Sequence, residues 1–293
     1  MDRKGDYNMD DNISYTPEIE PSKKERSYNW KTAIGLQQVD LLTPSDYLIE
    51  TANANIEGKI SLYEAEHLIN EYYEQKPDRK SDESRTEEAD KVAFRIANIL
   101  SSKAFKLSPA TLLTIHKQLF EGIYSFAGKI RDYNISKKEW VLNDESVTYD
   151  DFRTVRQSME YDIDKEKDFD YGTLDERATV DHIGKFISDF WQIHAFGEGN
   201  TRAIAVFAIK YLRTFGYDVA NDTFEKNSFY FRNALVRANY NDRKNGIVAT
   251  PIYLNRFFYN LILDETNVLK SREIHVGTNL RKKLSQFNSD CES

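Results

Sequence analysis

Apolar residues recur at helical spacing through most of the chain. A period of three to four residues predicts amphipathic helices. The segments with this pattern are residues 43–58, 61–76, 87–100, 108–124, 176–194, 201–216, 228–242 and 250–263. The segment 201–216 is apolar almost all round, which predicts a buried central helix. The sequence therefore predicts an all-α fold.

Thr43 followed by Pro44 is predicted to cap the first of these helices, with the proline at the first helical position. Polar residues also mark the starts of two later helices. Ser61 is followed three residues later by Glu64, the spacing of a capping box. Ser108 followed by Pro109 combines a capping side chain with a proline in the first turn, where a missing N–H breaks no helical bond. Both helices are predicted to begin directly after a serine.

One segment, residues 129–152, departs from helical spacing. Short apolar pieces stand on either side of the polar sequence SKKE, with Ile135 before it and Trp140 after it. Such pieces around a polar turn predict a small β-hairpin. Because an isolated hairpin is marginally stable in water, we expect it to lie against the helical body, over a pocket.

A run of charged residues, KPDRKSDESRTEEAD, divides the chain after the first two helices. A solvated linker that continues into the next helix explains such a run. We therefore predict a flexible polar arm at 1–29, a helical module at 30–80, a main domain at 81–270 and a tail at 271–293.

Composition narrows the class of partner. The net charge of −8 and the pI of about 5.3 are the opposite of what general binding to a nucleic-acid backbone requires. The single cysteine, Cys291, excludes a disulfide framework and suits a reducing compartment. No window approaches the roughly 18 apolar residues of a membrane span, and the N-terminal sequence lacks the apolar core of a signal peptide. We expect a cytoplasmic protein that binds neither a membrane nor nucleic acid in general.

The candidate chemistry lies in the loop between two predicted helices. His194 falls on the apolar face of the preceding helix, so its imidazole is expected to point inward, and Phe196 is expected to anchor the loop in the core. Gly199 stands at the start of the next helix, whose unpaired N–H groups favour a phosphate. Arg202 adds a fork of donors for phosphate oxygens, and Glu198 beside them suits Mg²⁺.

Together these residues indicate transfer of a phosphate-linked group to an acceptor hydroxyl, with His194 taking the proton of the acceptor. Singly, each residue has a structural explanation. His194 could be a core histidine bonded to a carbonyl, and Glu198 a charge at a helix start. Gly199 could be a turn glycine and Arg202 a surface side chain. Their conjunction favours the functional interpretation.

The sequence HAFGEGNTR, residues 194–202, resembles the signature H-x-F-x-[D/E]-G-N-x-R of the Fic (filamentation induced by cAMP) family. The resemblance spans about residues 85–265 and includes FAGKIRDYNISKKEWVL, which is similar to the entry of that family's β-hairpin flap. It implies an all-α Fic fold with a small flap, and transfer of AMP from ATP to a protein Ser, Thr or Tyr hydroxyl.

The resemblance also implies a role for each matching residue. His194 would be the general base, Glu198 would hold Mg²⁺, and Asn239 in the weaker match VRAN would lie beside the adenine. The anion hole would consist of Gly199, Asn200, Thr201 and Arg202. The flap would register the target by strand addition through Asn134, Ile135, Ser136, Trp140, Val141 and Leu142.

Two positions depart from the family pattern. Thr201 stands where the family often has glycine; its N–H can still serve, and its hydroxyl could add a bond. Ala205 stands where many members have a second arginine for the γ-phosphate. The alanine removes a partner of the terminal phosphate.

The sequence NANIEG, residues 53–58, resembles the family's inhibitory motif [S/T]-x-x-x-E-[G/N]. Asn53 replaces the hydroxyl residue, whereas Glu57 and Gly58 match, and the surrounding helices resemble a VbhA-type antitoxin module. In relatives the glutamate pairs with the second arginine, so here Glu57 needs another partner, for which Arg202 is the candidate. The alternative is an acid of the last helical turn before a C-cap glycine.

The sequence therefore predicts an autoinhibited protein adenylyltransferase that uses ATP and Mg²⁺ and acts on a protein hydroxyl, self-modification included. Three alternatives stay open. The first is transfer of another phosphate-linked group, although Doc-type kinases typically have lysine in place of Thr201. The second is a deAMPylase that uses His194 and Glu198. The third is a nucleotide-binding interaction module without turnover, which Ala205 favours.

Overall fold

The computed structural model describes residues 21–75 and 81–277. Residues 1–20 of the predicted arm and 278–293 of the predicted tail, with Cys291, lie outside the described residues. Within the described ranges the chain forms helices and one isolated antiparallel bridge, Asp242–Ile247, but no strand. The all-α prediction is confirmed.

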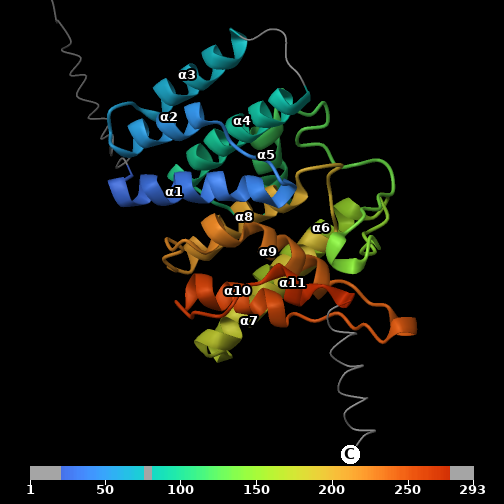
Figure 1. Ribbon diagram of the computed structural model, residues 1–293. Helices are drawn as coiled ribbons and strands as arrows, with labels where there is room; N and C mark the ends of the chain where they lie inside the picture. Colours follow the sequence, from blue (N-terminus) through green and yellow to red (C-terminus); the bar gives the residue numbers. More distant parts are fainter. Residues whose placement is uncertain (1–20, 76–80, 278–293) are drawn as a thin grey trace, which may run out of the picture.

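The helices and 3₁₀ turns follow one another as Figure 1 shows. They are α1 (Lys23–Gly35), η1 (Leu36–Asp40), α2 (Asp46–Ile56), α3 (Leu62–Glu74), α4 (Ser81–Ser101), α5 (Pro109–Phe120), η2 (Trp140–Leu142), α6 (Val155–Lys167), η3 (Tyr171–Thr173), α7 (Glu176–Gln192), α8 (Asn200–Thr214), α9 (Thr223–Ala238), η4 (Arg243–Asn245), α10 (Ile252–Ile262) and α11 (Ser271–Ile274).

The predicted start at Thr43 is wrong, because the Ser45 side chain caps α2 and Pro44 lies before the helix. The two starts at Ser61 and Ser108 are confirmed. The hydroxyl of Ser61 accepts a hydrogen bond from the N–H of Glu64 (3.1 Å), and the Glu64 carboxylate accepts one from the N–H of Ser61 (2.7 Å). Ser108 caps α5, and Pro109 stands in the first turn of that helix. Local sequence thus determines where these two helices begin.

The first helix begins earlier than the apolar pattern indicates. α1 begins at Lys23 because Ser22 and Glu25 form a second capping box, inside the segment predicted as an arm. On the same helix Trp30 is 1% exposed and donates a hydrogen bond to Asn55 of α2 (2.9 Å). α1 packs against α4 and α9, so the N-terminal helices share one hydrophobic core with the rest of the described chain.

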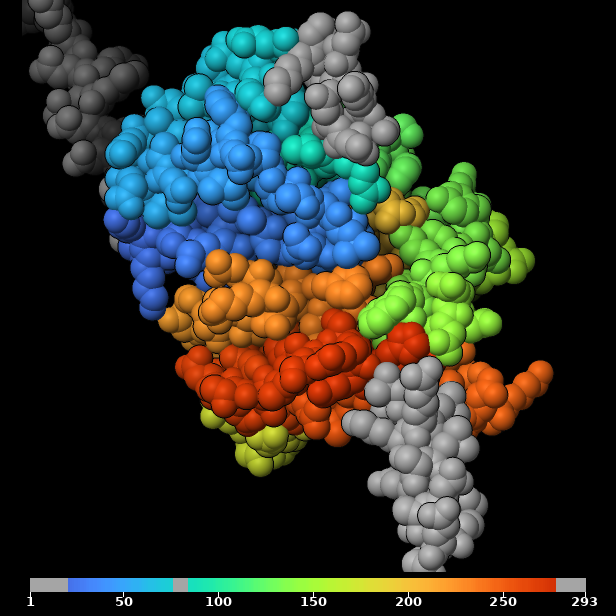
Figure 2. Space-filling model, in the orientation of Figure 1, coloured from blue at the N-terminus to red at the C-terminus, as the bar shows by residue number. Residues whose placement is uncertain are grey.

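Helix α8 is the buried centre that its apolar sequence predicts. All of its residues from Asn200 to Leu212 are buried. It contacts α5, α7, α4 and the 3₁₀ turn η1, while α2 and α3 lie outermost at one end of the molecule (Figure 1). In Figure 2 the N-terminal helices lie directly along α9 and cover this side of the centre. We call the part from α1 to α3, with η1, the N-terminal segment. The start of α8 therefore lies beneath this segment.

The predicted β-hairpin is wrong. The chain does double back, since the N–H of Glu139 donates to the carbonyl of Glu145 (3.0 Å), but the reversal is the 3₁₀ turn η2 and the residues after it. The polar sequence SKKE is not the turn. Val141 and Leu142 are buried in the hydrophobic core, so the apolar residues expected to form a strand anchor the reversal instead. We call residues 131–150 the flap segment.

Within residues 21–75 and 81–277, no helix combines the length and the apolar character needed to cross a bilayer.

Candidate active site

The loop between α7 and α8 holds its histidine in an unusual backbone conformation. His194 has φ of +51°, in the left-handed region where a residue with a side chain is strained. Arg131 fixes this conformation, because its Nε donates to the carbonyl of His194 (2.7 Å) and its backbone N–H donates to that of Ala195 (2.9 Å). Arg131 is buried and was not singled out from the sequence.

The imidazole of His194 is buried and unbonded. The side chain points inward as predicted, is 3% exposed and stacks on Tyr149 with ring centroids 4.0 Å apart. Neither ring nitrogen, nor the Tyr149 hydroxyl, has a hydrogen-bond partner in the described chain. The backbone carbonyl of Trp191 lies close enough to act on the ring and raise its pKa, although it makes no aligned hydrogen bond with either nitrogen.

The charge state of His194 follows from these surroundings. Burial, and after it the positive charges of Lys137, Arg131 and Arg232, hold the pKa of His194 well below its usual value. The ring is neutral at physiological pH and keeps a free lone pair. A neutral imidazole with an unused lone pair is the state that a general base requires.

Asn200 and Phe196 give the loop its shape. The Asn200 side chain accepts from the N–H of Phe196 (2.9 Å) and donates to the carbonyl of Phe196 (2.7 Å). Phe196 is 1% exposed, as expected of an anchor, and stacks on His116 with centroids 3.6 Å apart. The Asn200 amide is thus used to hold the loop. The backbone N–H groups in the first turn of α8 receive no cap from a side chain.

His116 positions the carbonyl of the predicted metal ligand. The N–H of Gly128 donates to its Nδ1 (2.9 Å), so Nε2 carries the hydrogen and donates to the carbonyl of Glu198 (2.9 Å). Burial lowers the pKa of His116 to about 4, which keeps this tautomer neutral. The sequence shows His116 as a lone histidine on an apolar helix face, and such a residue carries no signal of its partner.

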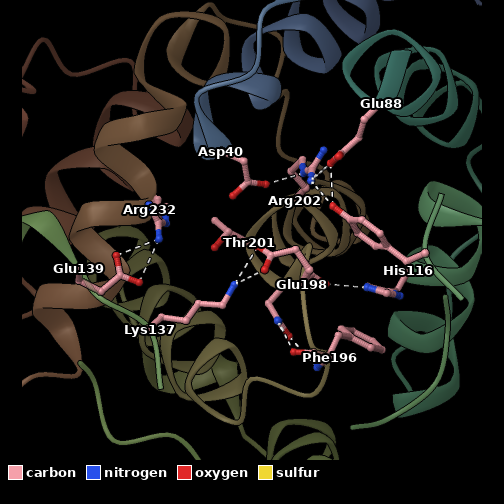
Figure 3. Close-up of polar contacts among 12 residues, drawn as sticks. Asp40, Glu88, His116, Lys137, Glu139, Phe196, Glu198, Thr201, Arg202 and Arg232 are labelled. Carbon is pink, nitrogen blue, oxygen red and sulfur yellow. Dashed lines mark hydrogen bonds and ion pairs between the residues drawn. The ribbon is translucent and has the colours of Figure 1, made fainter. Parts of the chain in front are cut away.

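The carboxylate of Glu198 is held by the flap segment. The ammonium of Lys137 lies 2.8 Å and 2.9 Å from its two oxygens (Figure 3). The Lys137 side chain is 20% exposed and that of Glu198 is 44% exposed. Sequence analysis placed Lys137 in a polar turn and missed this contact.

Beyond Glu198 the chain enters α8 through a glycine that no other residue can replace without strain. Gly199 has φ of +77°, and a Cβ at this position would lie 2.4 Å from the ring of Phe120. As the N-cap residue it offers no side chain to the first turn, so the N–H groups there keep their capacity to bind an anion.

Residues 106–212 match the model of the Fic/DOC family. This part of the chain is therefore similar to Fic/DOC domains. The matched segment includes α5, the flap segment, the loop with His194 and most of α8. No curated protein matches the chain. Because the match begins after the N-terminal helices, their likeness to an antitoxin module stays a prediction.

Arg202 lies in the segment that matches the Fic/DOC model, but it is enclosed by acids from outside that segment. It is fully buried, with Nε 2.8 Å from Asp40 of η1 and an Nη 2.6 Å from Glu88 of α4 (Figure 3). The contact with Asp40 is an ion pair without the alignment of a hydrogen bond. Gln37 and Tyr124 complete the cage, at 3.3 Å and 3.4 Å. The surface position considered for Arg202 is therefore wrong.

Thr201, the third anion-hole residue expected from the resemblance, has its hydroxyl turned to the core. The indole N–H of Trp191 donates to it over 2.9 Å. Ala205, at the position of the second arginine, is also fully buried. Arg202 is therefore the only arginine in the first two turns of α8, and the site lacks the second arginine of the family pattern.

The inhibitory motif lies away from Arg202. Glu57 is half exposed, is the C-cap residue of α2 and pairs with Lys23 (2.7 Å). Gly58 follows with φ of +72°, and Asn53 is exposed. The expected pairing of Glu57 with Arg202 is wrong: Asp40 and Glu88 take that place.

The remaining predicted residues are Asn239, at the end of α9, and the residues of the flap segment. Asn239 donates to Ser188 and to the carbonyl of Leu235, which ties the end of α9 to α7. In the flap segment, Asn134 is bonded to the backbone N–H of Phe152 (2.9 Å). Ile135 is half-buried and Ser136 exposed, Trp140 is half exposed against His275, and Val141 and Leu142 are buried.

The metal-binding groups near the loop suit a divalent cation that binds together with the phosphates of a nucleotide. In the described ranges no cluster of three or more His, Cys, Asp or Glu side chains could hold a metal ion. Glu198 alone offers carboxylate oxygens beside an uncapped helix start. One carboxylate with substrate phosphates is a common way of binding Mg²⁺, so the donor set fits that ion.

Proposed function

We propose that the Fic/DOC domain transfers AMP from ATP to a Ser, Thr or Tyr hydroxyl of a protein. The observation that carries this proposal is the neutral imidazole of His194, buried without a hydrogen-bond partner beside the uncapped start of α8. Burying two ring nitrogens without hydrogen bonds costs free energy. The fold nevertheless keeps this unfavourable arrangement five residues before Gly199. A site that binds a hydroxyl and a phosphate explains both features.

In the proposed reaction, His194 accepts the proton of the acceptor hydroxyl while that oxygen forms a bond to the α-phosphorus of ATP. The bond from the α-phosphorus to the bridging oxygen breaks, and pyrophosphate leaves. Because His194 is 3% exposed under Tyr149, the acceptor reaches it once that ring moves aside.

The phosphates would lie on the first turn of α8. Gly199 lets the backbone approach them closely, and the N–H groups of Asn200, Thr201 and Arg202 point out of the helix start. Glu198 would hold Mg²⁺, which neutralises phosphate charge when bound. His116 keeps Glu198 in place through its carbonyl.

We further propose that the N-terminal segment restrains this reaction through Asp40. Arg202 is a phosphate clamp in the proposed reaction, yet Asp40 and Glu88 already occupy its guanidinium. Asp40 belongs to η1, which follows α1 and contacts α8 and α9. Movement of η1 would free one side of Arg202, whereas the Glu57–Lys23 pair can change without affecting the site.

A nucleotide-binding module without turnover is the alternative that the structure favours most. The enclosed Arg202 and the buried Ala205 leave few cations for a triphosphate. Transfer of another phosphate-linked group and removal of AMP from a modified protein use the same residues and remain open to test.

Labelled ATP separates these functions. Wild type and His194→Ala are incubated in cell lysate with ATP labelled at the α- or the γ-phosphate. We expect protein labelled from α-ATP by wild type alone. Label from γ-ATP indicates a kinase, and label from neither, with nucleotide bound, indicates a binding module. Loss of α-label from pre-modified protein identifies a deAMPylase.

A further inference from the structure

The flap segment contributes a lysine whose ionic partner is the carboxylate that a metal ion needs. Lys137 contacts both oxygens of Glu198, at 2.8 Å and 2.9 Å. A divalent cation on the same oxygens would lie within a few ångströms of the ammonium and repel it strongly. A cation that binds Glu198 therefore displaces the ammonium of Lys137.

Two buried or part-buried acids close to this site, Glu139 and Asp40, already have cations. Glu139 is 1% exposed and pairs with Arg232 at 2.9 Å, and Asp40 pairs with Arg202 at 2.8 Å (Figure 3). Lys137 is close enough for its charge to act on the side chains of Glu139 and His194. Burial raises the pKa of Glu139, and the charges of Arg232 and Lys137 oppose that rise; burial and then the charge of Lys137 lower the pKa of His194. A displaced ammonium would thus have to compete with an arginine for either of these two carboxylates.

The ammonium then needs an anion inside the site. With its side chain 20% exposed, Lys137 is partly desolvated, and an unpaired charge in such surroundings is unfavourable. Arg202 and Arg232 are each engaged by acids that a metal ion on Glu198 would not take. Lys137 is therefore the cation of this cluster that metal binding sets free.

We propose that Lys137 is a phosphate-binding residue that exchanges Glu198 for the phosphates of the nucleotide when metal and nucleotide enter together. The inference rests on the proposed function, because it assigns the nucleotide to the start of α8. It gives the flap segment a role in binding ATP, and it supplies a phosphate partner in addition to Arg202, which the buried Ala205 does not.

The proposal predicts two effects of opposite sign, which loss of structure would not produce. Without the ammonium, Glu198 is free to bind a metal ion, so the affinity for Mn²⁺ alone rises. The same change removes a phosphate partner, so the affinity for a metal–nucleotide complex falls. Each effect should be about tenfold, the change that a charged hydrogen bond of modest strength produces.

The experiment compares Lys137→Met with Lys137→Arg and with the neighbouring exposed Lys138→Met. Mn²⁺ binding is measured by electron paramagnetic resonance, and binding of Mg²⁺ with α,β-methylene-ATP by calorimetry. We expect Lys137→Met alone to show both effects, Lys137→Arg to keep most nucleotide affinity, and Lys138→Met to match wild type. Circular dichroism establishes that each variant is folded.

Two results would overturn the proposal and differ in meaning. If wild type binds the nucleotide and Lys137→Met binds it equally well, Lys137 is a partner of Glu198 and nothing more, and the proposed function stands. If wild type binds no nucleotide even at millimolar concentration, the proposed function fails and takes this inference with it.

Discussion

The Nε of Arg202 lies 2.8 Å from a carboxylate oxygen of Asp40, which joins the start of α8 to the N-terminal segment. The two residues are far apart in sequence, and the Fic/DOC match includes Arg202 but not Asp40. A side chain outside the matched domain thus occupies the guanidinium that a phosphate would need. This contact makes the N-terminal segment part of the site.

Asp40→Asn should therefore strengthen nucleotide binding. The amide keeps the shape of the side chain but not its charge, so a phosphate competes with Glu88 alone for Arg202. We expect affinity for Mg–ATP to rise about tenfold, which is about 1.4 kcal/mol, because a charge that competes for the guanidinium is removed. Calorimetry measures it. The control is Glu57→Gln, whose carboxylate pairs with Lys23 on the surface and whose loss should leave affinity unchanged.

His194→Ala should abolish transfer and preserve binding. Loss of a general base typically costs a factor of about 10²–10⁴ in rate. The first turn of α8 and Glu198 are untouched, so the dissociation constant for the nucleotide should stay within about threefold of wild type. Single-turnover transfer of α-label and calorimetry give the two values. Transfer at the wild-type rate would remove His194 from the mechanism.

The pH dependence of transfer follows from the lowered pKa of His194. The base must be neutral, and its pKa lies well below the usual value, so its protonation begins at correspondingly lower pH. As far as this group is concerned, we expect the rate to begin to fall only below the pH at which an ordinary histidine becomes protonated. In Lys137→Met one positive charge is removed, so the acid limb should move to higher pH. An acid limb centred near pH 6.5 in wild type would contradict this environment for His194.

His116 links the stability of the fold to pH. Its pKa is about 4 in the folded protein, below the unfolded value of 6.5. The unfolded chain therefore binds a proton more readily, so stability present above about pH 6.5 is lost as pH falls towards 4, by up to roughly 3 kcal/mol. In His116→Gln, whose amide can make both hydrogen bonds without titrating, urea unfolding should show a smaller loss between pH 7 and pH 5. His194 adds a loss of the same sign in both proteins.

Gly199→Ala tests the close approach of the loop to α5. Its Cβ would lie 2.4 Å from Phe120, and the backbone has φ of +77°. Gly216 has φ of +82° but nothing within 4 Å of a Cβ, so Gly216→Ala measures backbone strain alone. We expect about 1 kcal/mol for Gly216→Ala and a further 1–3 kcal/mol for Gly199→Ala in urea unfolding. Equal losses would show that the ring of Phe120 moves aside freely.

Local patterns predicted most of the fold. A helix cap and an apolar period each depend on residues only a few positions apart. The caps Ser61 and Ser108 and the buried helix α8 could therefore be identified without the structure. The reversal in the flap segment could not. Burial of Val141 and Leu142 depends on what the rest of the chain places against them, and tertiary packing overrides a short alternating pattern.

The site was predictable where the motif is contiguous. The loop with His194, Phe196 and Glu198 was identified, and the structure places it directly before α8. The partners were not predictable, because Asp40, Glu88 and His116 reach the loop from elements distant in sequence. An isolated acid or histidine in such an element has no spacing that reveals its contact.

The central claim is that a polyphosphate binds at the start of α8 with His194 beside it. A crystal structure of Asp40→Asn with Mg²⁺ and α,β-methylene-ATP tests it most directly. We predict phosphate density against the backbone N–H groups from Asn200 to Arg202, with Tyr149 displaced and the α-phosphate next to the imidazole. Nucleotide bound elsewhere, with His194 still covered by Tyr149, would contradict the account.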